Sequence, residues 1–218
     1  MALPRRSILA LVPLAPGLLA PSLLATPALA QGAAPAPAAP AVPASDPRLG
    51  DRAIGPATAP VRVMEFFSLT CSHCAAFHKE TFPRGKTELV APGQVRLVWR
   101  DFPLDRLALV AAAVARSLPA ERYEGFIGAL LNNQDRWAFT RGDPKEELAK
   151  MAALAGMNRA TYDQVFADEA LQRAILEGRA KAEQEFQISA TPSFVFGSRT
   201  QSGNMAFEVF ARHVQEAK

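Results

Sequence analysis

The chain has 218 residues, 49% of them hydrophobic, and its formal net charge at pH 7 is +3. A charge this close to balance gives no indication of a nucleic-acid partner. The sequence contains no glycine-rich phosphate loop and no nucleotide-binding fingerprint, so no cofactor is predicted. The two cysteines, Cys71 and Cys74, stand three residues apart and are the first candidates for chemistry.

The N-terminus predicts a cleavable export signal over residues 1–30. Arg5 and Arg6 precede a Pro-interrupted apolar run that ends at Ala28-Leu29-Ala30, which is the order of regions in such a signal. The prolines break the run well short of the roughly 20 apolar residues that a membrane span needs. We therefore expect a mature chain that begins near Gln31. The arginine pair also leaves the twin-arginine export route open.

An Ala/Pro-rich segment follows the predicted signal. Residues 31–45 consist largely of these two residue types, which favour an extended linker and cannot bury a core. Residues 46–218 remain, and a segment of that length can form one domain with a hydrophobic core of its own.

Two strands and a helical segment are predicted at the start of this domain. The first strand covers Val61–Phe67, which is rich in β-branched and aromatic residues and follows a proline. Helical character extends from Ser72 to about Val90, with an interruption at Pro83–Gly85. After a Pro-Gly turn, the alternation from Gln94 to Asp101 predicts the second strand.

A long helical block comes next. No strand candidate of comparable strength occurs from Leu104 to Phe186, where apolar residues recur at helical spacing. Asp143 and Pro144 supply an N-terminal cap and a first-turn proline. The predicted helices cover 107–118, a segment that begins at 119, a segment from 143 to about 156, 159–166 and 169–185.

Strand character returns at Ser193–Phe196, with a second short strand near Arg199–Gln201. A helix from about Met205 to Glu216 ends the chain. This order of elements predicts an α/β domain with a thioredoxin-like fold. The domain carries a helical insertion, about 104–187, between its second and third core strands.

The cysteine motif lies between a buried strand and a helix. Glu65-Phe66-Phe67-Ser68 leads into Cys71-Ser72-His73-Cys74, and Thr191-Pro192 precedes a later strand. Together these segments resemble the DsbA-like thiol:disulfide oxidoreductases of the bacterial periplasm, and the resemblance covers nearly all of residues 46–218. The best-known members have proline where this chain has Ser72, and the residues between the cysteines tune the redox potential.

The residues themselves indicate the same chemistry. A thiolate attacks disulfides, and the unpaired N–H groups at a helix N-terminus lower the pKa of a thiol such as Cys71. His73 can add positive charge nearby, which would stabilise the reduced dithiol and make the disulfide a stronger oxidant. Cys74 is then the resolving thiol.

Two further features are assigned roles. Glu65 is a charged residue in an apolar strand, and we interpret it as a buried proton-transfer group beside Cys74, against the alternative of an outward-facing side chain. Thr191 and Pro192 resemble the cis-proline loop of thioredoxin-like proteins. The resemblance implies a cis bond there and backbone groups that bind a substrate chain.

Other readings of the cysteines are weaker. A purely structural disulfide between Cys71 and Cys74 would close a loop so short that it constrains the unfolded chain by only about 2 kcal/mol. A zinc site would need a second ligand pair, so no metal site is predicted. His78 and His213 are interpreted as exposed helical residues, and the aromatic residues from 123 to 137 as ordinary helix packing.

The predicted function is the introduction of disulfides into exported proteins, by a monomer in the periplasm. The resemblance implies reduced or misfolded exported proteins as substrates and a membrane quinone-linked oxidase as electron acceptor. The alternatives are a disulfide isomerase or reductase, since Thr191 before Pro192 also occurs in isomerase-type relatives, and a periplasmic metallochaperone that uses the same thiolates as ligands.

Overall fold

The computed structural model describes Val42, Pro43 and residues 45–218. The predicted export signal, residues 1–30, lies outside the described residues, as does most of the predicted linker, residues 31–45. Within the described part of the chain, no helix is both long enough and apolar enough to cross a membrane.

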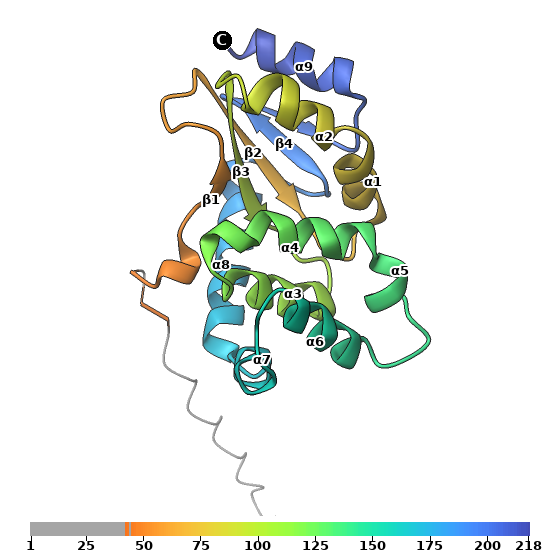
Figure 1. Cartoon of the computed structure of the whole chain (residues 1–218). Coiled ribbons are helices and arrows are strands. Elements are labelled where there is room, and N and C mark those ends of the chain that lie inside the picture. The colour runs from red at the N-terminus through yellow and green to blue at the C-terminus, as the bar shows by residue number, and fades with distance from the viewer. Residues whose placement is uncertain (1–41, 44) are drawn as a thin grey trace, which may run out of the picture. The chain divides into compact units, whose positions relative to one another are not determined.

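A five-stranded sheet forms the centre of the domain (Figure 1), in the order β1-β3-β2-β4-β5. Strand β2 is central, because it runs parallel to β3 on one side and antiparallel to β4 on the other. The edge strands β1 and β5 are antiparallel to their neighbours. The strands are β1 Arg52–Ile54, β2 Val61–Phe67, β3 Val95–Asp101, β4 Ser193–Phe196 and β5 Arg199–Ser202.

Helices cover both faces of this sheet. Phe77 of α1 and Phe210 of α9 pack with the β4 side chains Phe194 and Phe196 in one hydrophobic core. The opposite face, which includes Phe66 of β2, packs against the end of α8 in a second core. These helices are α1 Ser72–Glu80, α2 Phe82–Gly85, η2 Lys86–Val90, α8 Glu169–Glu185 and α9 Phe207–Glu216.

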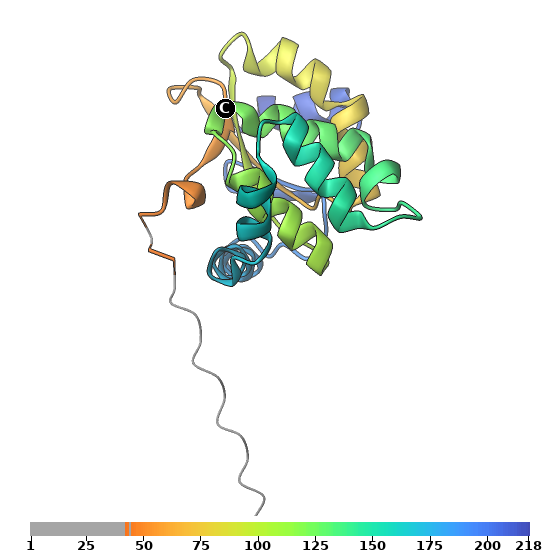
Figure 2. The same ribbon diagram turned by 60° about the horizontal axis from the view of Figure 1, so that its bottom comes forward.

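The remaining helices lie between β3 and α8 in the sequence and group together in space (Figure 2). They are α3 Arg106–Arg116, α4 Ala120–Asn132, α5 Gln134–Trp137, α6 Pro144–Leu154 and α7 Arg159–Phe166. The aromatic residues Tyr123, Phe126 and Trp137 of this block are buried. Their prediction as packing residues is therefore confirmed.

Local capping fixes the starts of three helices in this region. The side chains of Asp143, Asn158 and Asp168 each accept a hydrogen bond from a backbone N–H in the first turn of α6, α7 or α8. Such caps satisfy N–H groups that have no partner within the helix. The predicted bounds 159–166 and 169–185 are those of α7 and α8, so both predictions are confirmed.

Two features of the fold differ from the prediction. Strand β1 was missed, because its three residues are too short to show an alternating pattern and are held by pairing with β3. The predicted break in the first helical segment at Pro83–Gly85 is wrong. The chain bends at Thr81 instead, and Pro83 lies in the first turn of α2, where its missing N–H needs no partner.

Candidate functional site

The two cysteines occupy the start of α1, just after the central strand β2 ends. Both are free thiols. Cys71 is the N-cap residue, and its sulfur accepts a hydrogen bond of 3.3 Å from the backbone N–H of Cys74. Cys71 is 7% exposed and Cys74 is completely buried. An incoming sulfur atom therefore reaches Cys71 and not Cys74.

The environment drives the acidities of the two thiols apart. The pKa of Cys71 is lowered to about 5, and the largest cause is a hydrogen bond from the Cys74 thiol. Burial acts to raise this pKa, whereas the backbone N–H groups of Cys74 and His73 act to lower it further. Burial, and then the hydrogen bond to Cys71, raise the pKa of Cys74 well above its ordinary value. The site therefore holds one thiolate and one thiol at neutral pH.

A loop from the far end of the sequence lies against Cys71. The Thr191–Pro192 peptide bond is cis, as the resemblance implied. The Cys71 sulfur lies 3.3 Å from the carbonyl oxygen of Thr191, which can accept a hydrogen bond from the protonated thiol. Residues 120 positions apart are thereby brought to one site, because β4 pairs with β2 next to the start of α1.

Glu65 is buried beneath the dithiol and forms a pair with His78. The prediction that Glu65 is buried is confirmed, since it is 0% exposed. The His78 Nε2 atom lies 3.1 Å and 3.3 Å from the two carboxylate oxygens of Glu65. The prediction that His78 is an exposed helical residue is wrong, because α1 presents this side chain to the face of β2 that carries Glu65.

The other two histidines differ from His78. His73 is exposed in the first turn of α1. His213 is not the exposed residue that was predicted: its side chain is only 19% exposed, with its ring against Phe196 and its Nδ1 atom 3.5 Å from Glu216. The amphipathic pattern of the last helix places it partly inside, at the edge of the core.

Gln134 is a site residue that the sequence did not indicate. Its side-chain amide nitrogen donates hydrogen bonds to the backbone oxygens of Leu69 and Cys71, at 2.8 Å and 3.0 Å. Gln134 belongs to α5, so the helical insertion holds the turn that carries the reactive cysteine. A glutamine in a short helix has no distinguishing local pattern, and only its position in the fold gives it this contact.

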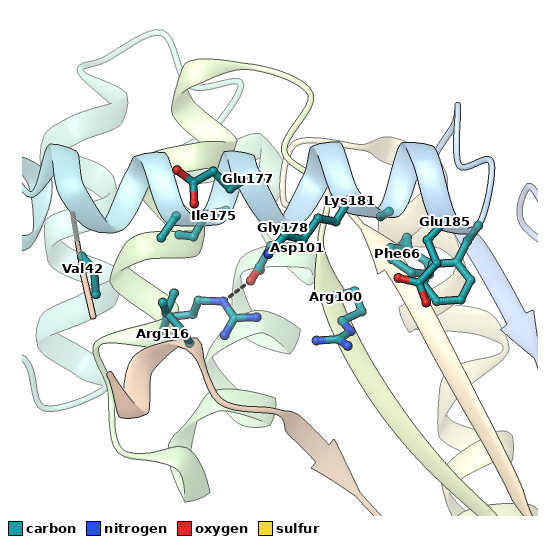
Figure 3. A pocket seen from close by; sticks show the side chains of 14 residues that line it. Val42, Phe66, Arg100, Asp101, Arg116, Ile175, Glu177, Gly178, Lys181 and Glu185 are labelled. Atoms are coloured by element: carbon teal, nitrogen blue, oxygen red, sulfur yellow. Dashed lines mark hydrogen bonds and ion pairs between the residues drawn. The ribbon is translucent and has the colours of Figure 1, made fainter. Parts of the chain in front are cut away.

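A cavity of about 400 Å³ lies elsewhere, between α8 and the end of β3 (Figure 3). It is lined by Phe66, Arg100, Arg116 and Lys181, among others. Phe66 faces the opposite side of the sheet from Glu65, so this cavity is separate from the dithiol. Within residues 42–43 and 45–218, no group of three or more His, Cys, Asp and Glu side chains is arranged to hold a metal ion.

The fold and the paired thiols define a thioredoxin-fold protein with a redox-competent dithiol. A family model described as thioredoxin matches residues 48–216. The chain therefore belongs to the thioredoxin family, and its relatives make it a DsbA-like member of that family.

Three relatives illustrate the match. A candidate protein-disulfide oxidoreductase of Rickettsia conorii is 27% identical over 168 residues, which cover 77% of this chain and 60% of the relative. The thiol:disulfide interchange protein DsbA of Bordetella pertussis is 27% identical over 143 residues, or 64% of each chain. The crystal structure of Wolbachia pipientis alpha-DsbA1 matches with a TM-score of 0.70 and 26% sequence identity. The match covers 77% of this chain and 90% of the Wolbachia chain. This chain spans about 60% of the length of the Rickettsia relative.

Proposed function

We propose that this protein is a thiol:disulfide oxidase that introduces disulfides into exported proteins through the Cys71-Ser72-His73-Cys74 motif. The observation that carries the proposal is the separation of the two acidities: the pKa of Cys71 is lowered to about 5, while that of Cys74 is raised. Stabilising the Cys71 thiolate stabilises the reduced form, and a stabilised reduced form makes the disulfide a stronger oxidant.

The exchange proceeds in two displacements. A substrate thiolate attacks Cys71 Sγ in the oxidised protein, so the bond between Cys71 and Cys74 breaks, a mixed disulfide forms and Cys74 leaves as a thiolate that takes up a proton. A second substrate thiolate attacks the substrate sulfur of the mixed disulfide. Cys71 then leaves as a thiolate, and the substrate has lost two electrons to the protein dithiol.

The surrounding residues are given roles in this cycle. Thr191 and Pro192 bind the substrate chain, which is supported by the position of the Thr191 carbonyl 3.3 Å from Cys71 Sγ. His73, exposed beside Cys71, adds positive charge that favours the thiolate. Glu65 exchanges a proton with Cys74, a role supported by its complete burial on the α1 side of the sheet.

Glutathione equilibration tests the direction of exchange. The protein is equilibrated with mixtures of reduced and oxidised glutathione, and free thiols are trapped by alkylation and counted by mass spectrometry. We expect a potential far more oxidising than the about −270 mV of thioredoxin. The Cys71→Ser variant serves as the control and gains no second thiol. A potential equal to that of thioredoxin would overturn the oxidase proposal in favour of a reductase.

We also propose that the protein acts as a monomer in the periplasm after removal of residues 1–30, and that a membrane quinone-linked oxidase reoxidises it. The basic, apolar and small-residue regions of the N-terminus support export. Fractionation of cells that produce the full chain, followed by intact-mass analysis, tests this. We expect a periplasmic product that begins near Gln31; an uncleaved cytoplasmic product would contradict it.

A further inference from the structure

Two hydrogen-bonded units of the backbone meet at Cys71. The backbone N–H of Cys71 donates to the carbonyl oxygen of Ser68 at 3.1 Å, which closes the turn that follows β2. The carbonyl oxygen of Cys71 then accepts from the backbone N–H of Ala75 at 3.1 Å, at the start of α1. The orientation of the helix start relative to the turn therefore depends on what joins these two units.

One side-chain amide joins the turn to the helix start. The Nε2 atom of Gln134 donates to the carbonyl oxygen of Leu69 in the turn at 2.8 Å, and to that of Cys71 at 3.0 Å. Both hydrogens of the amide nitrogen are thereby used, and only the N–H side of a planar amide can face two carbonyl oxygens. Gln134 is 7% exposed. Removing its donors therefore carries the cost of a buried hydrogen bond that is left unmade.

The helix that carries Gln134 is itself anchored. α5 has only four residues, but Trp137 at its end is 0% exposed and donates its indole N–H to the backbone oxygen of Leu130 in α4 at 2.8 Å. The backbone oxygen of Gln134 accepts from the N–H groups of Ala138 and Phe139, both at 2.9 Å. A side chain can fix the position of another group only when it is itself held, and α5 meets this condition.

The helical insertion contacts the same turn at a second point, which lies at the surface. Thr70 Oγ1 donates to one carboxylate oxygen of Asp105 at 2.6 Å, and the other oxygen accepts from the backbone N–H of Ala108 at the start of α3. The Thr70 contact is exposed, so water can replace it at little cost. The buried contact made by Gln134 is therefore the one that fixes the turn.

We propose that Gln134 is a positioning residue for the disulfide exchange. It holds the turn so that the backbone N–H groups of the first turn of α1 stay directed at the Cys71 sulfur, and through it the helical insertion sets the redox potential of the dithiol. This inference rests on the proposed exchange at Cys71 and Cys74. It gives the insertion a role in the chemistry as well as in packing.

The effect favours the reduced protein because only that form carries a charge on Cys71. The Cys71 sulfur accepts a hydrogen bond from the backbone N–H of Cys74 at 3.3 Å, and this bond weakens if the helix start rotates relative to the turn. The carbonyl oxygens of Leu69 and Cys71 also place partial negative charge in the turn that holds the thiolate, and the amide hydrogens of Gln134 offset it. Both effects stabilise the thiolate and leave the neutral disulfide unaffected, so both make the disulfide a stronger oxidant.

The test compares the wild-type protein with Gln134→Met, which keeps the length of the side chain but has no N–H donor. The pKa of Cys71 in the reduced protein is followed by the ultraviolet absorbance of the thiolate, and the redox potential by equilibration with glutathione. We expect the pKa of Cys71 to rise by about one unit, a shift on the scale of one hydrogen bond. The disulfide should become about tenfold less oxidising, which corresponds to about 30 mV.

Gln172→Met is the matched control. Gln172 is also a buried glutamine, 4% exposed, and its Nε2 atom donates to the backbone oxygen of Phe166 at 3.0 Å, but it belongs to α8. Both substitutions remove a buried donor and should lower the urea midpoint of the oxidised protein. Gln172→Met should leave the pKa of Cys71 and the redox potential at their wild-type values. If Gln134→Met also loses stability alone, Gln134 has only a structural role and the proposal is wrong.

Gln134→Asn is measured as a second variant, and it replaces Gln134→Met if that protein does not fold. Asparagine keeps the amide but is one methylene shorter, so it cannot reach both carbonyl oxygens. We expect the pKa and the potential to shift in the same direction, and wild-type values of both would overturn the proposal. A wild-type potential equal to that of thioredoxin would contradict the oxidase function and leave the comparison of variants intact. Unchanged values in the Gln134 variants would contradict only the present inference.

Discussion

Two buried acid–base pairs belong to neighbouring strands of the same sheet, and they differ in what surrounds them. Asp101 at the end of β3 forms an ion pair with Arg116 at the end of α3 (Figure 3). Arg116 also donates to the backbone oxygens of Arg48 and Gly50, and Tyr123 donates to Asp101. Glu65 and His78, in contrast, have aromatic rings and a thiol as neighbours.

The difference separates a structural pair from one suited to proton transfer. Burial is the largest single cause and acts to lower the pKa of Arg116. The charge of Asp101, the hydrogen bond to it and the nearby Tyr123 together outweigh burial, so the net pKa is raised. A guanidinium of this kind keeps its proton at every accessible pH, so the Asp101–Arg116 pair can only hold elements together. An imidazole can take either charge state. The same geometry therefore permits chemistry only beside the dithiol.

The largest effect that distinguishes the pairs is expected from Asp101→Asn. The substitution leaves the Arg116 guanidinium buried without its counter-charge, and breaking a buried pair in this way costs about 3 kcal/mol or more. We expect the free energy of unfolding of the oxidised protein to fall by that amount in urea titrations at pH 7. The redox potential of the dithiol should not change. A stability equal to that of wild type would show that the backbone oxygens alone satisfy Arg116.

A smaller effect is expected from the chemically identical change in the other pair, Glu65→Gln. Glutamine keeps the size of the side chain and can share a hydrogen bond with the His78 ring, so no guanidinium is left buried without a counter-charge. We expect the free energy of unfolding to change by no more than about 1 kcal/mol, the range of one hydrogen bond. The measurement is the same urea titration. A loss as large as that of Asp101→Asn would contradict this contrast between the pairs.

A third effect is a dependence on pH and concerns the reduced protein. Because the pKa of Cys71 is lowered from its ordinary 9.0 to about 5 in the folded state, the unfolded chain binds more protons between these values. The stability that the thiolate contributes is then fully present near pH 9, decreases as the pH falls and is lost below about 5. We expect the urea midpoint of the reduced wild type, relative to Cys71→Ser, to rise with pH across this window. A flat difference would contradict the lowered pKa.

Much of the fold could be predicted because its signals are local. The alternation from Gln94 to Asp101 and the cap at Asp143 act over a few residues, and the strand and helix that they predict are present. Strand β1 could not be found in this way, since three residues carry no pattern and pairing with β3 decides their conformation.

For the candidate site, the sequence by itself determined the reactive pair. A dithiol at a helix start after an apolar strand follows from residues that are neighbours in the chain, because the helix terminus and the thiol that it activates belong to one segment. The sequence also contained Glu65 and Thr191-Pro192. It left open which face of the strand Glu65 occupies, because β2 is buried on both faces.

Only the tertiary structure decided which groups meet. His78 is partnered by Glu65 because α1 packs on one face of β2, and Gln134 reaches the Cys71 turn because the helical insertion folds back over it. Burial and long-range contact depend on the whole fold, and no local pattern encodes them. A histidine that the sequence suggested was exposed is thereby placed in a buried pair with Glu65.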